Sequence, residues 1–181
     1  MKKTTKLVTI SIYVAIAIVL DIIKEFIPFL NMPSGGSVNI ALIPIALCSF
    51  HLGIKDGILC GLLWFIVSSL IGLNKYFISF GQIIFDYIIP SVILGVSSCF
   101  YKKKNLFEIE FGIIITMIIR TLSICISGSY YWFDMSLAAG SKEAWIFSLT
   151  YNLPYSIATL IMLMIIIPLL LKSIKKYLII N

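Results

Sequence analysis

Six apolar stretches, separated by short polar connections, run along the chain. They cover residues 7–29, 38–52, 57–73, 77–101, 112–128 and 144–171. Because about 20 helical residues, at about 1.5 Å each, span the hydrocarbon core of a bilayer, stretches of this kind predict membrane-spanning helices. The second stretch is short and contains Pro44, so a tilted, kinked or only partly spanning helix stays open there, and its boundaries are the least well defined. The pattern predicts an all-α fold, an integral membrane bundle of six helices.

Lysines distinguish the two sides of this predicted bundle. An even number of crossings places both termini on one side, and ten lysines share that side: Lys2, Lys3, Lys6, Lys55, Lys102, Lys103, Lys104, Lys172, Lys175 and Lys176. Only Lys24, Lys75 and Lys142 fall on the other side. Positively charged residues are retained in the cytoplasm, so both termini are predicted to be cytoplasmic.

The composition agrees with a protein that lies in lipid. Of 181 residues, 60% are hydrophobic and 12% are charged, and the mean hydropathy is +1.07. A soluble domain of this size needs far more charged surface, whereas in a bilayer apolar side chains face hydrocarbon. The length suits one transmembrane domain over residues 1–181, in the plasma membrane. The net charge of +6 is interpreted as membrane orientation, not as nucleic-acid binding.

Several kinds of chemistry lack their usual residues. The four cysteines, Cys48, Cys60, Cys99 and Cys125, are scattered without a CxxC pair, so neither a metal site nor a disulfide framework is expected. The sequence has no GxxxxGK[ST] phosphate loop. A membrane-embedded protease would need a Ser–His pair within the bilayer, but the only histidine, His51, maps to the cytoplasmic end of the second stretch. The protein is therefore not expected to be an enzyme, and no cofactor is expected.

Three polar residues lie well inside the predicted helices. Asp86, Arg120 and Asn152 belong to the fourth, fifth and sixth stretches, and each is on the order of 10–14 Å below the outer surface at about 1.5 Å per residue. Because intramembrane polar groups are costly, three at one depth predict a polar pocket open to the outside. An Asp86–Arg120 pair that only holds the bundle together is the alternative. Asp21 and Lys24, near the outer end of the first stretch, are close enough to pair locally.

Helical spacing and aromatic residues add to the pocket prediction. A roughly continuous face of the fifth stretch carries Arg120, Ile124, Gly128 and Trp132 at intervals of four residues. Gly128 allows a ligand to approach the backbone closely. Tyr76 and Trp132 map near the mouth, and Tyr87 adjoins Asp86. Aromatic faces beside a carboxylate suit a flat, cationic or hydrogen-bonding ring. A plain aromatic belt at the membrane interface would also account for some of these rings.

Several segments, taken in order, resemble a known family. They are residues 37–45 (SVNIALIPI), 53–57 (GIKDG) with 61–64 (GLLW), 82–87 (QIIFDY), 120–132, and 145–152 (WIFSLTYN). Together they resemble the thiamine-specific substrate-binding subunit (S component) of energy-coupling factor transporters, the ThiT family. The resemblance covers most of the chain, and it implies a high-affinity membrane subunit that binds thiamine for uptake.

The same resemblance implies roles for particular residues. The positions that match the family's pocket are Tyr76, Asp86, Tyr87, Arg120, Gly128, Trp132, Phe147 and Asn152. By resemblance, Asp86 accepts hydrogen bonds from the aminopyrimidine, Asn152 makes a further polar contact, and Arg120 orients Asp86. Three aromatic side chains would stack on the rings or bound them: Tyr76, Trp132 and Phe147.

The sequence departs from the family pattern at four places. Asp86 stands where Glu is expected, Ile124 where some members have His, and Phe147 where Tyr is usual; residues 31–37 contain no Trp. Each missing polar group removes a directional contact of roughly 1 kcal/mol. An S component for another vitamin, or for a precursor of thiamine, therefore stays open as an alternative.

The resemblance also implies partners, namely a transmembrane coupling subunit and two cytoplasmic ATPase subunits, which alone would use ATP. Docking would use a face of the first stretch with small side chains, where Ser11 and Ala15 fit a small-xxx-small pattern that Val19 interrupts. Ordinary packing within the bundle is the alternative at these positions. A solitary small-molecule carrier and an intramembrane enzyme are the remaining, less favoured functions.

Overall fold

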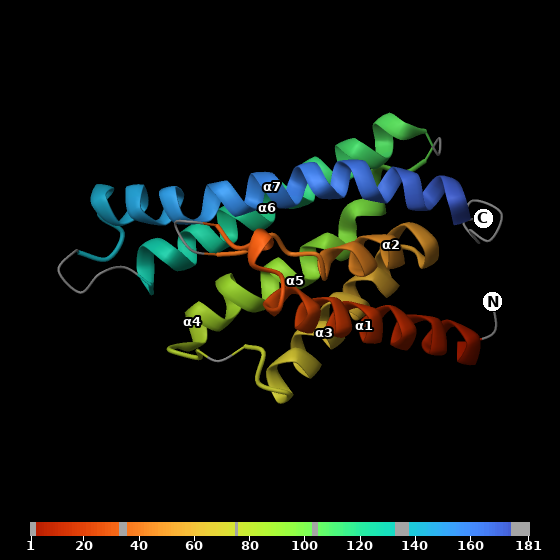
Figure 1. The fold of residues 1–181 in the computed structure, drawn as a ribbon, viewed down its shortest axis with the longest axis horizontal. Helices are drawn as coiled ribbons and strands as arrows, with labels where there is room; N and C mark the ends of the chain where they lie inside the picture. Colours follow the sequence, from red (N-terminus) through yellow and green to blue (C-terminus); the bar gives the residue numbers. More distant parts are fainter. Residues whose placement is uncertain (1–2, 33–35, 75, 103–104, 133–137, 175–181) are drawn as a thin grey trace.

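The residues that the structure describes form six helical segments in one bundle (Figure 1). The computed structural model describes residues 3–32, 36–74, 76–102, 105–132 and 138–174. Five segments are single helices: α1 (Lys3–Glu25), α2 (Leu42–Leu52), α3 (Ile54–Leu70), α6 (Leu106–Tyr130) and α7 (Lys142–Ile174). The fourth segment runs through α4 (Phe80–Gln82), η2 (Ile83–Ile88), α5 (Ile89–Ile93) and η3 (Leu94–Phe100). A 3-10 turn, η1 (Pro28–Leu30), follows α1.

The predicted all-α membrane bundle of six helices is confirmed, and of the alternatives left open for the second segment the structure shows a helix that spans only part of the membrane. Four helices are long and apolar enough to cross a membrane, namely α1, the fourth segment, α6 and α7. Helix α2 has only 11 residues, about 16 Å of helix at about 1.5 Å per residue, which is too short to cross the hydrocarbon core. A single residue, Gly53, joins α2 to α3. Its φ of 101° is a conformation that glycine adopts readily and that is strained for other residues.

Capping residues explain why several helix boundaries were predicted wrongly. Helix α6 begins six residues before the predicted start at 112, because the Asn105 side chain accepts a hydrogen bond from the Glu108 backbone N–H at 2.9 Å. The fourth segment begins at Phe80 instead of 77, because Ser79 caps it by accepting a bond from the Gln82 N–H at 3.2 Å. Polar side chains that cap a helix lie outside the apolar stretch, so hydropathy alone misplaces these ends.

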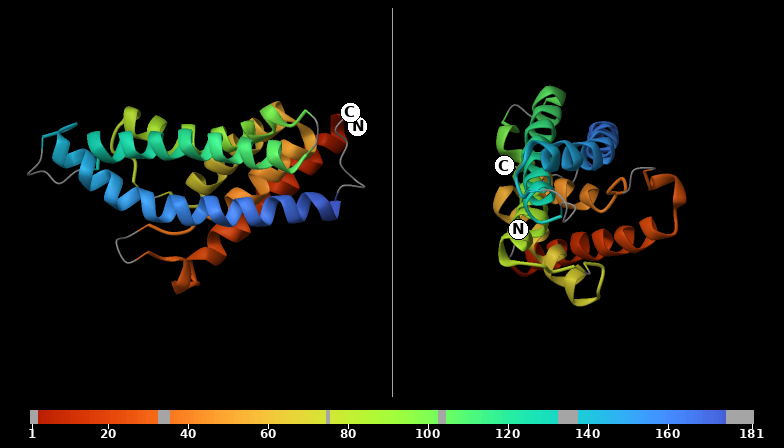
Figure 2. Two further views of the ribbon diagram at one scale, coloured as in Figure 1. Left: turned by 90° about the horizontal axis from the view of Figure 1, so that it is seen from above. Right: turned by 90° about the vertical axis from the view of Figure 1, so that its left-hand side faces the viewer.

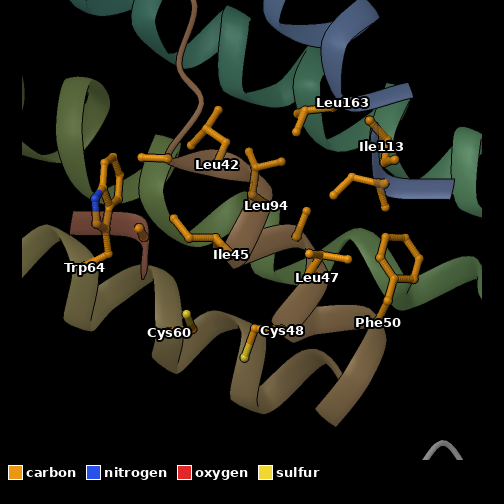
Figure 3. Close-up of a cluster of buried hydrophobic side chains, with 14 of the residues drawn as sticks. Leu42, Ile45, Leu47, Cys48, Phe50, Cys60, Trp64, Leu94, Ile113 and Leu163 are labelled. Carbon is orange, nitrogen blue, oxygen red and sulfur yellow. The ribbon is translucent and has the colours of Figure 1, made fainter. Parts of the chain in front are cut away.

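Helix α2 lies at the centre of the hydrophobic core (Figure 3). Eight of its 11 residues are buried, as expected for a helix that is apolar on every side. Around it pack side chains from α1, α3, η3, α6 and α7, among them Cys60, Leu94, Ile113 and Leu163. Pro44 lies in the first turn of α2, where backbone N–H groups have no partner within the helix, so proline is tolerated there.

The outer surface of the bundle is apolar over long stretches. Large hydrophobic side chains are exposed along α1, α6 and α7, the arrangement that lipid requires. Figures 1 and 2 show that the start of α1 and the end of α7 lie at the same end of the bundle. Helices α6 and α7 run side by side over most of their length, in opposite directions.

A glycine–glycine crossing joins α3 to the fourth segment. A Cβ atom at Gly95 would lie 2.2 Å from the Gly57 carbonyl carbon, and one at Gly57 would lie 2.5 Å from the Gly95 oxygen. The nearby Ser49 hydroxyl of α2 donates to the same Gly95 oxygen at 2.6 Å. Both obstacles are backbone atoms, which cannot rotate away, so the close crossing of these helices depends on the two glycines.

Gly95→Ala is therefore expected to lower the unfolding free energy by about 1–3 kcal/mol, because the added methyl group must push two backbones apart. The measurement is the melting temperature of the purified protein in detergent. The matched control is Val8→Ile, which also adds one methyl group, but on an exposed face of α1. Equal melting temperatures for Gly95→Ala and Val8→Ile would show that the crossing is not tightly packed.

Candidate functional site

A cavity of about 430 Å³ opens between the fourth segment, α6 and α7. Ten residues line it: Tyr76, Asp86, Ile124, Gly128, Trp132, Phe147, Ser148, Tyr151, Asn152 and Tyr155. The segments that carry these residues lie toward the end of the bundle where α4 and the start of α7 are found, away from the start of α1 (Figure 1). Its volume falls within the range of about 300–1,000 Å³ that is usual for small-molecule sites.

The carboxylate of this cavity stands on a π-helical turn. Asp86 belongs to η2, in which the backbone N–H of Ile89 bonds to the Ile84 carbonyl five residues back. Pro90 follows, and its ring has no N–H and would clash with the carbonyl four residues back, that of Asp86, in a regular helix. The wider π turn is a common feature of helices at functional sites.

Two neutral donors hold the Asp86 carboxylate. Its Oδ2 accepts a hydrogen bond from Gln82 Nε2 at 3.0 Å and another from Trp132 Nε1 at 2.9 Å. Among the described residues, none donates to Oδ1, so this oxygen remains available to a ligand in the cavity. The carboxylate is thus fixed in direction, while Oδ1 has no donor among the described residues.

The opposite wall is a polar cluster on α7. The Asn152 Nδ2 group donates to the Ser148 carbonyl at 2.9 Å and to the Ser148 hydroxyl at 3.1 Å, while Asn152 Oδ1 accepts from the Tyr155 hydroxyl. Both amide protons are therefore used within the protein. What Asn152 can still offer a ligand is the second lone pair of Oδ1.

Gly128 provides the space in which this wall meets α6. A Cβ atom at Gly128 would lie 2.2 Å from the Ser148 hydroxyl oxygen and 3.1 Å from Asn152 Nδ2. Any larger residue would push into the polar cluster and into the cavity. The sequence predicts that other groups approach the backbone of Gly128 closely, and the Ser148 and Asn152 side chains do so in the structure.

Arg120 lies near the cavity but does not line it. It is 7% exposed, and its Nε and Nη1 atoms have no hydrogen-bond partner in the described part of the chain. No Asp86–Arg120 ion pair within 4.0 Å is found among the described residues. The expected direct contact is therefore not seen, and Gln82 and Trp132 orient Asp86 instead. The charge of Arg120 still acts on Asp86 and Tyr155 at longer range.

Tyr87 points away from the cavity, although it follows Asp86 in sequence. Its ring stacks on Phe65 of α3 at 6.0 Å between centroids, and its hydroxyl donates to the Tyr76 carbonyl at 2.9 Å. Tyr76 itself is 63% exposed, and its ring meets Trp132 edge to face at 5.7 Å. Tyr87 therefore supports the mouth of the cavity through the backbone of Tyr76 and is not a lining residue.

The structure brings six of the eight predicted site residues together in one cavity: Tyr76, Asp86, Gly128, Trp132, Phe147 and Asn152. Ser148, Tyr151 and Tyr155 were missed as lining residues. Ser148 and Tyr151 lie within residues 145–152, four residues from Asn152 and Phe147 respectively, and Tyr155 lies one turn further along α7, so the helical spacing would have found all three. Gln82 was also missed, although its i, i+4 spacing from Asp86 was visible.

An apolar helical bundle with an aromatic-walled cavity identifies a multi-pass membrane protein with a candidate small-molecule site. The comparisons with known proteins agree. The family model described as thiamine transporter protein (Thia_YuaJ) matches residues 7–179. Thiamine transporter ThiT of Bacillus subtilis (strain 168) is 34% identical over 188 residues, which cover 98% of this chain and 95% of that protein.

A solved structure of ThiT from Listeria monocytogenes is also similar. It has a TM-score of 0.80 and 25% sequence identity, and the match covers 98% of this chain and 99% of that one. The chain belongs to the thiamine transporter protein family. The family is named for transport, and the expectation that the protein is not an enzyme is confirmed by these names.

The long-range interaction of Arg120 with Asp86 is open to a double-mutant test. Arg120→Gln is expected to lower the melting temperature, because it removes a positive charge that acts on the half-buried Asp86 carboxylate. The double variant Arg120→Gln/Asp86→Asn should be more stable than the sum of the single effects, by a coupling of about 0.5–3 kcal/mol. Lys24→Gln, which removes a cation paired to Asp21 on α1, serves as the control and should add simply to Asp86→Asn. If the effects of Arg120→Gln and Asp86→Asn on stability also add simply, Arg120 does not interact with Asp86.

Proposed function

We propose that this protein is the high-affinity, membrane-embedded substrate-binding subunit of a thiamine uptake system, and that the cavity around Asp86 binds thiamine. The observation that carries the proposal is the carboxylate with one free oxygen inside an aromatic-walled cavity of about 430 Å³. Thiamine combines an aminopyrimidine, which has N–H donors, with a positively charged thiazolium ring. The names of the family and of its Bacillus and Listeria members support this substrate.

Each part of the cavity matches one part of such a ligand. Asp86 Oδ1 accepts a charge-assisted hydrogen bond from the aminopyrimidine, and its negative charge attracts the thiazolium. Tyr76 and Trp132 at the mouth, with Phe147 on α7, bound the flat rings and supply cation–π attraction. Asn152 Oδ1 is a second acceptor, while Gly128 leaves room for the ligand.

Thiamine binding is tested by titrating the purified protein and following intrinsic tryptophan fluorescence, since Trp132 lines the cavity. We expect a dissociation constant in the nanomolar to micromolar range. Asp86→Asn should weaken binding about tenfold or more, because it removes a hydrogen bond to a charged acceptor, worth about 1.5–3 kcal/mol.

The control variant is Asp21→Asn. Asp21 is a buried carboxylate as well, but it pairs with Lys24 at 2.7 Å on α1, outside the cavity. This variant should bind thiamine as the parent does. A parent protein that fails to bind thiamine would exclude this substrate. Titration with the aminopyrimidine precursor that lacks the thiazolium ring tests the alternative, and tighter binding of the precursor would favour it.

We also propose that transport requires an energy-coupling-factor membrane subunit and two cytoplasmic ATPases. The sequence lacks a phosphate loop of its own. Ser11 and Ala15 are exposed on α1, on the side opposite the buried Ile10, Val14 and Ala17. This exposure favours docking over packing within the bundle, because small side chains let another helix approach. The lysine distribution supports cytoplasmic termini, which would place the ATPases on the side of the start of α1.

Ala15→Leu tests the docking face. The larger side chain should reduce copurification of the coupling subunits and thiamine uptake by cells, while thiamine binding by the isolated protein stays unchanged. Ile161→Phe, a similar enlargement on an exposed face of α7, is the control and should leave uptake intact. Full uptake by Ala15→Leu would count against this face of α1, and uptake without any coupling subunit would favour a solitary carrier.

A further inference from the structure

We infer that Gln82 is a positioning residue for substrate binding: it sets the direction of the Asp86 carboxylate and links it to the mouth of the cavity. The inference deepens the proposed function and rests on it for the identity of the ligand. Gln82 does not line the cavity, so it acts through residues that do.

The Gln82 side chain is fully buried, with 0% exposure, and every atom of its amide is used. Its Nε2 donates to Asp86 Oδ2 at 3.0 Å and to the Tyr76 carbonyl at 3.3 Å, while its Oε1 accepts from the Ile78 N–H at 3.3 Å. The two partners on residues 76–78 belong to the extended segment before α4, and the third is the pocket carboxylate. One side chain therefore joins the mouth to the carboxylate.

These contacts close into a ring of interactions. The Tyr76 backbone is held by Gln82, the Tyr76 ring packs against Trp132, the Trp132 indole N–H donates to Asp86, and Asp86 accepts from Gln82. Tyr87 adds a second bond to the Tyr76 carbonyl. Since each member touches the next, displacement of Gln82 would disturb both the carboxylate and the aromatic mouth.

A neutral amide is suited to this position. An ionised donor at 3.0 Å from Asp86 would compensate the carboxylate charge, which a cationic ligand needs. Gln82 and Trp132 instead fix Oδ2 through uncharged N–H groups and leave the negative charge, with Oδ1, to the cavity. If the buried Gln82 amide lost these partners, its unpaired polar atoms would destabilise the protein, so the hydrogen bonds of the network stabilise one another.

A merely structural role would make Gln82 important for folding alone, and a double-mutant cycle separates the two roles. Gln82→Met keeps the length of the side chain and removes its hydrogen bonds. In the parent background it should weaken thiamine binding about five- to tenfold, chiefly through faster dissociation. In the Asp86→Asn background the same change should weaken binding less than about twofold, because no carboxylate remains to be positioned.

Ser79→Ala is the matched control. It removes the cap of the same helical turn, where the Ser79 hydroxyl accepts from the Gln82 backbone N–H at 3.2 Å, but leaves the Gln82 side chain intact. Binding should change less than about twofold. A loss equal to that of Gln82→Met would overturn the inference, since the effect would then come from the start of the helix. An equal loss from Gln82→Met in both backgrounds would overturn it as well.

Two further measurements keep the inference testable. Gln82→Asn shortens the side chain by one methylene and retains the amide; it should also weaken binding, because one short amide cannot reach both Asp86 and Tyr76. Melting temperatures of the ligand-free parent, single and double variants report the Gln82–Asp86 coupling whatever the ligand is. Additive melting effects would overturn the inference, whereas failure of the parent to bind thiamine would exclude only the proposed substrate.

Discussion

The site depends on keeping one carboxylate inside a bundle whose surroundings are hydrocarbon. Lipid offers no hydrogen bonds, so a polar group at this depth must be satisfied by the protein or by a ligand. The chain meets this requirement with donors from two separate segments, Gln82 within the same helix and Trp132 after α6. The π-helical turn before Pro90 carries the carboxylate, and the glycine at 128 leaves space opposite it. Cavity, mouth and polar wall are all arranged around that one group.

The two halves of the bundle have different tasks. The cavity uses Ile124 and Gly128 of α6 and residues between 147 and 155 of α7, whereas the hydrophobic core uses residues between 109 and 117 of α6 and between 163 and 171 of α7. The short α2 lies in the core half and fills it with its buried side chains. The cavity is therefore closed on the side of the core by tightly packed apolar residues. A bound molecule can leave toward that side only if these helices move.

How far the sequence predicts this arrangement depends on the kind of interaction. The six helices follow from hydropathy. Helical rise placed Asp86, Arg120 and Asn152 at one depth, although Arg120 does not line the cavity, and the spacing of four residues along one helix face added Gly128 and Trp132. The observed helix ends differ from the predicted ones because the side chains of Asn105 and Ser79 cap the helices, and the length of an apolar stretch contains no information about capping. Tyr87 was placed in the pocket because it adjoins Asp86, yet neighbouring residues on a helix point in different directions, and its ring faces α3. The pairing of Asp86 with Trp132 instead of Arg120 depends on how separate helices are set against each other, and periodicity contains no information about that.

Arg120 shows why this choice of partner matters for recognition. A guanidinium bonded directly to Asp86 would form a buried ion pair, and a cationic ligand would then have to displace it or meet a neutralised carboxylate. In the structure Arg120 stays beyond ion-pair distance, with two of its nitrogen atoms unpaired among the described residues. At that separation its charge lowers the cost of an ionised Asp86 without occupying the carboxylate oxygens. Neutral donors give the carboxylate its direction, a more distant cation makes its charge tolerable, and the free oxygen is left to the ligand. The cation affinity that the proposed function requires therefore depends on which groups do not touch Asp86 as much as on those that do.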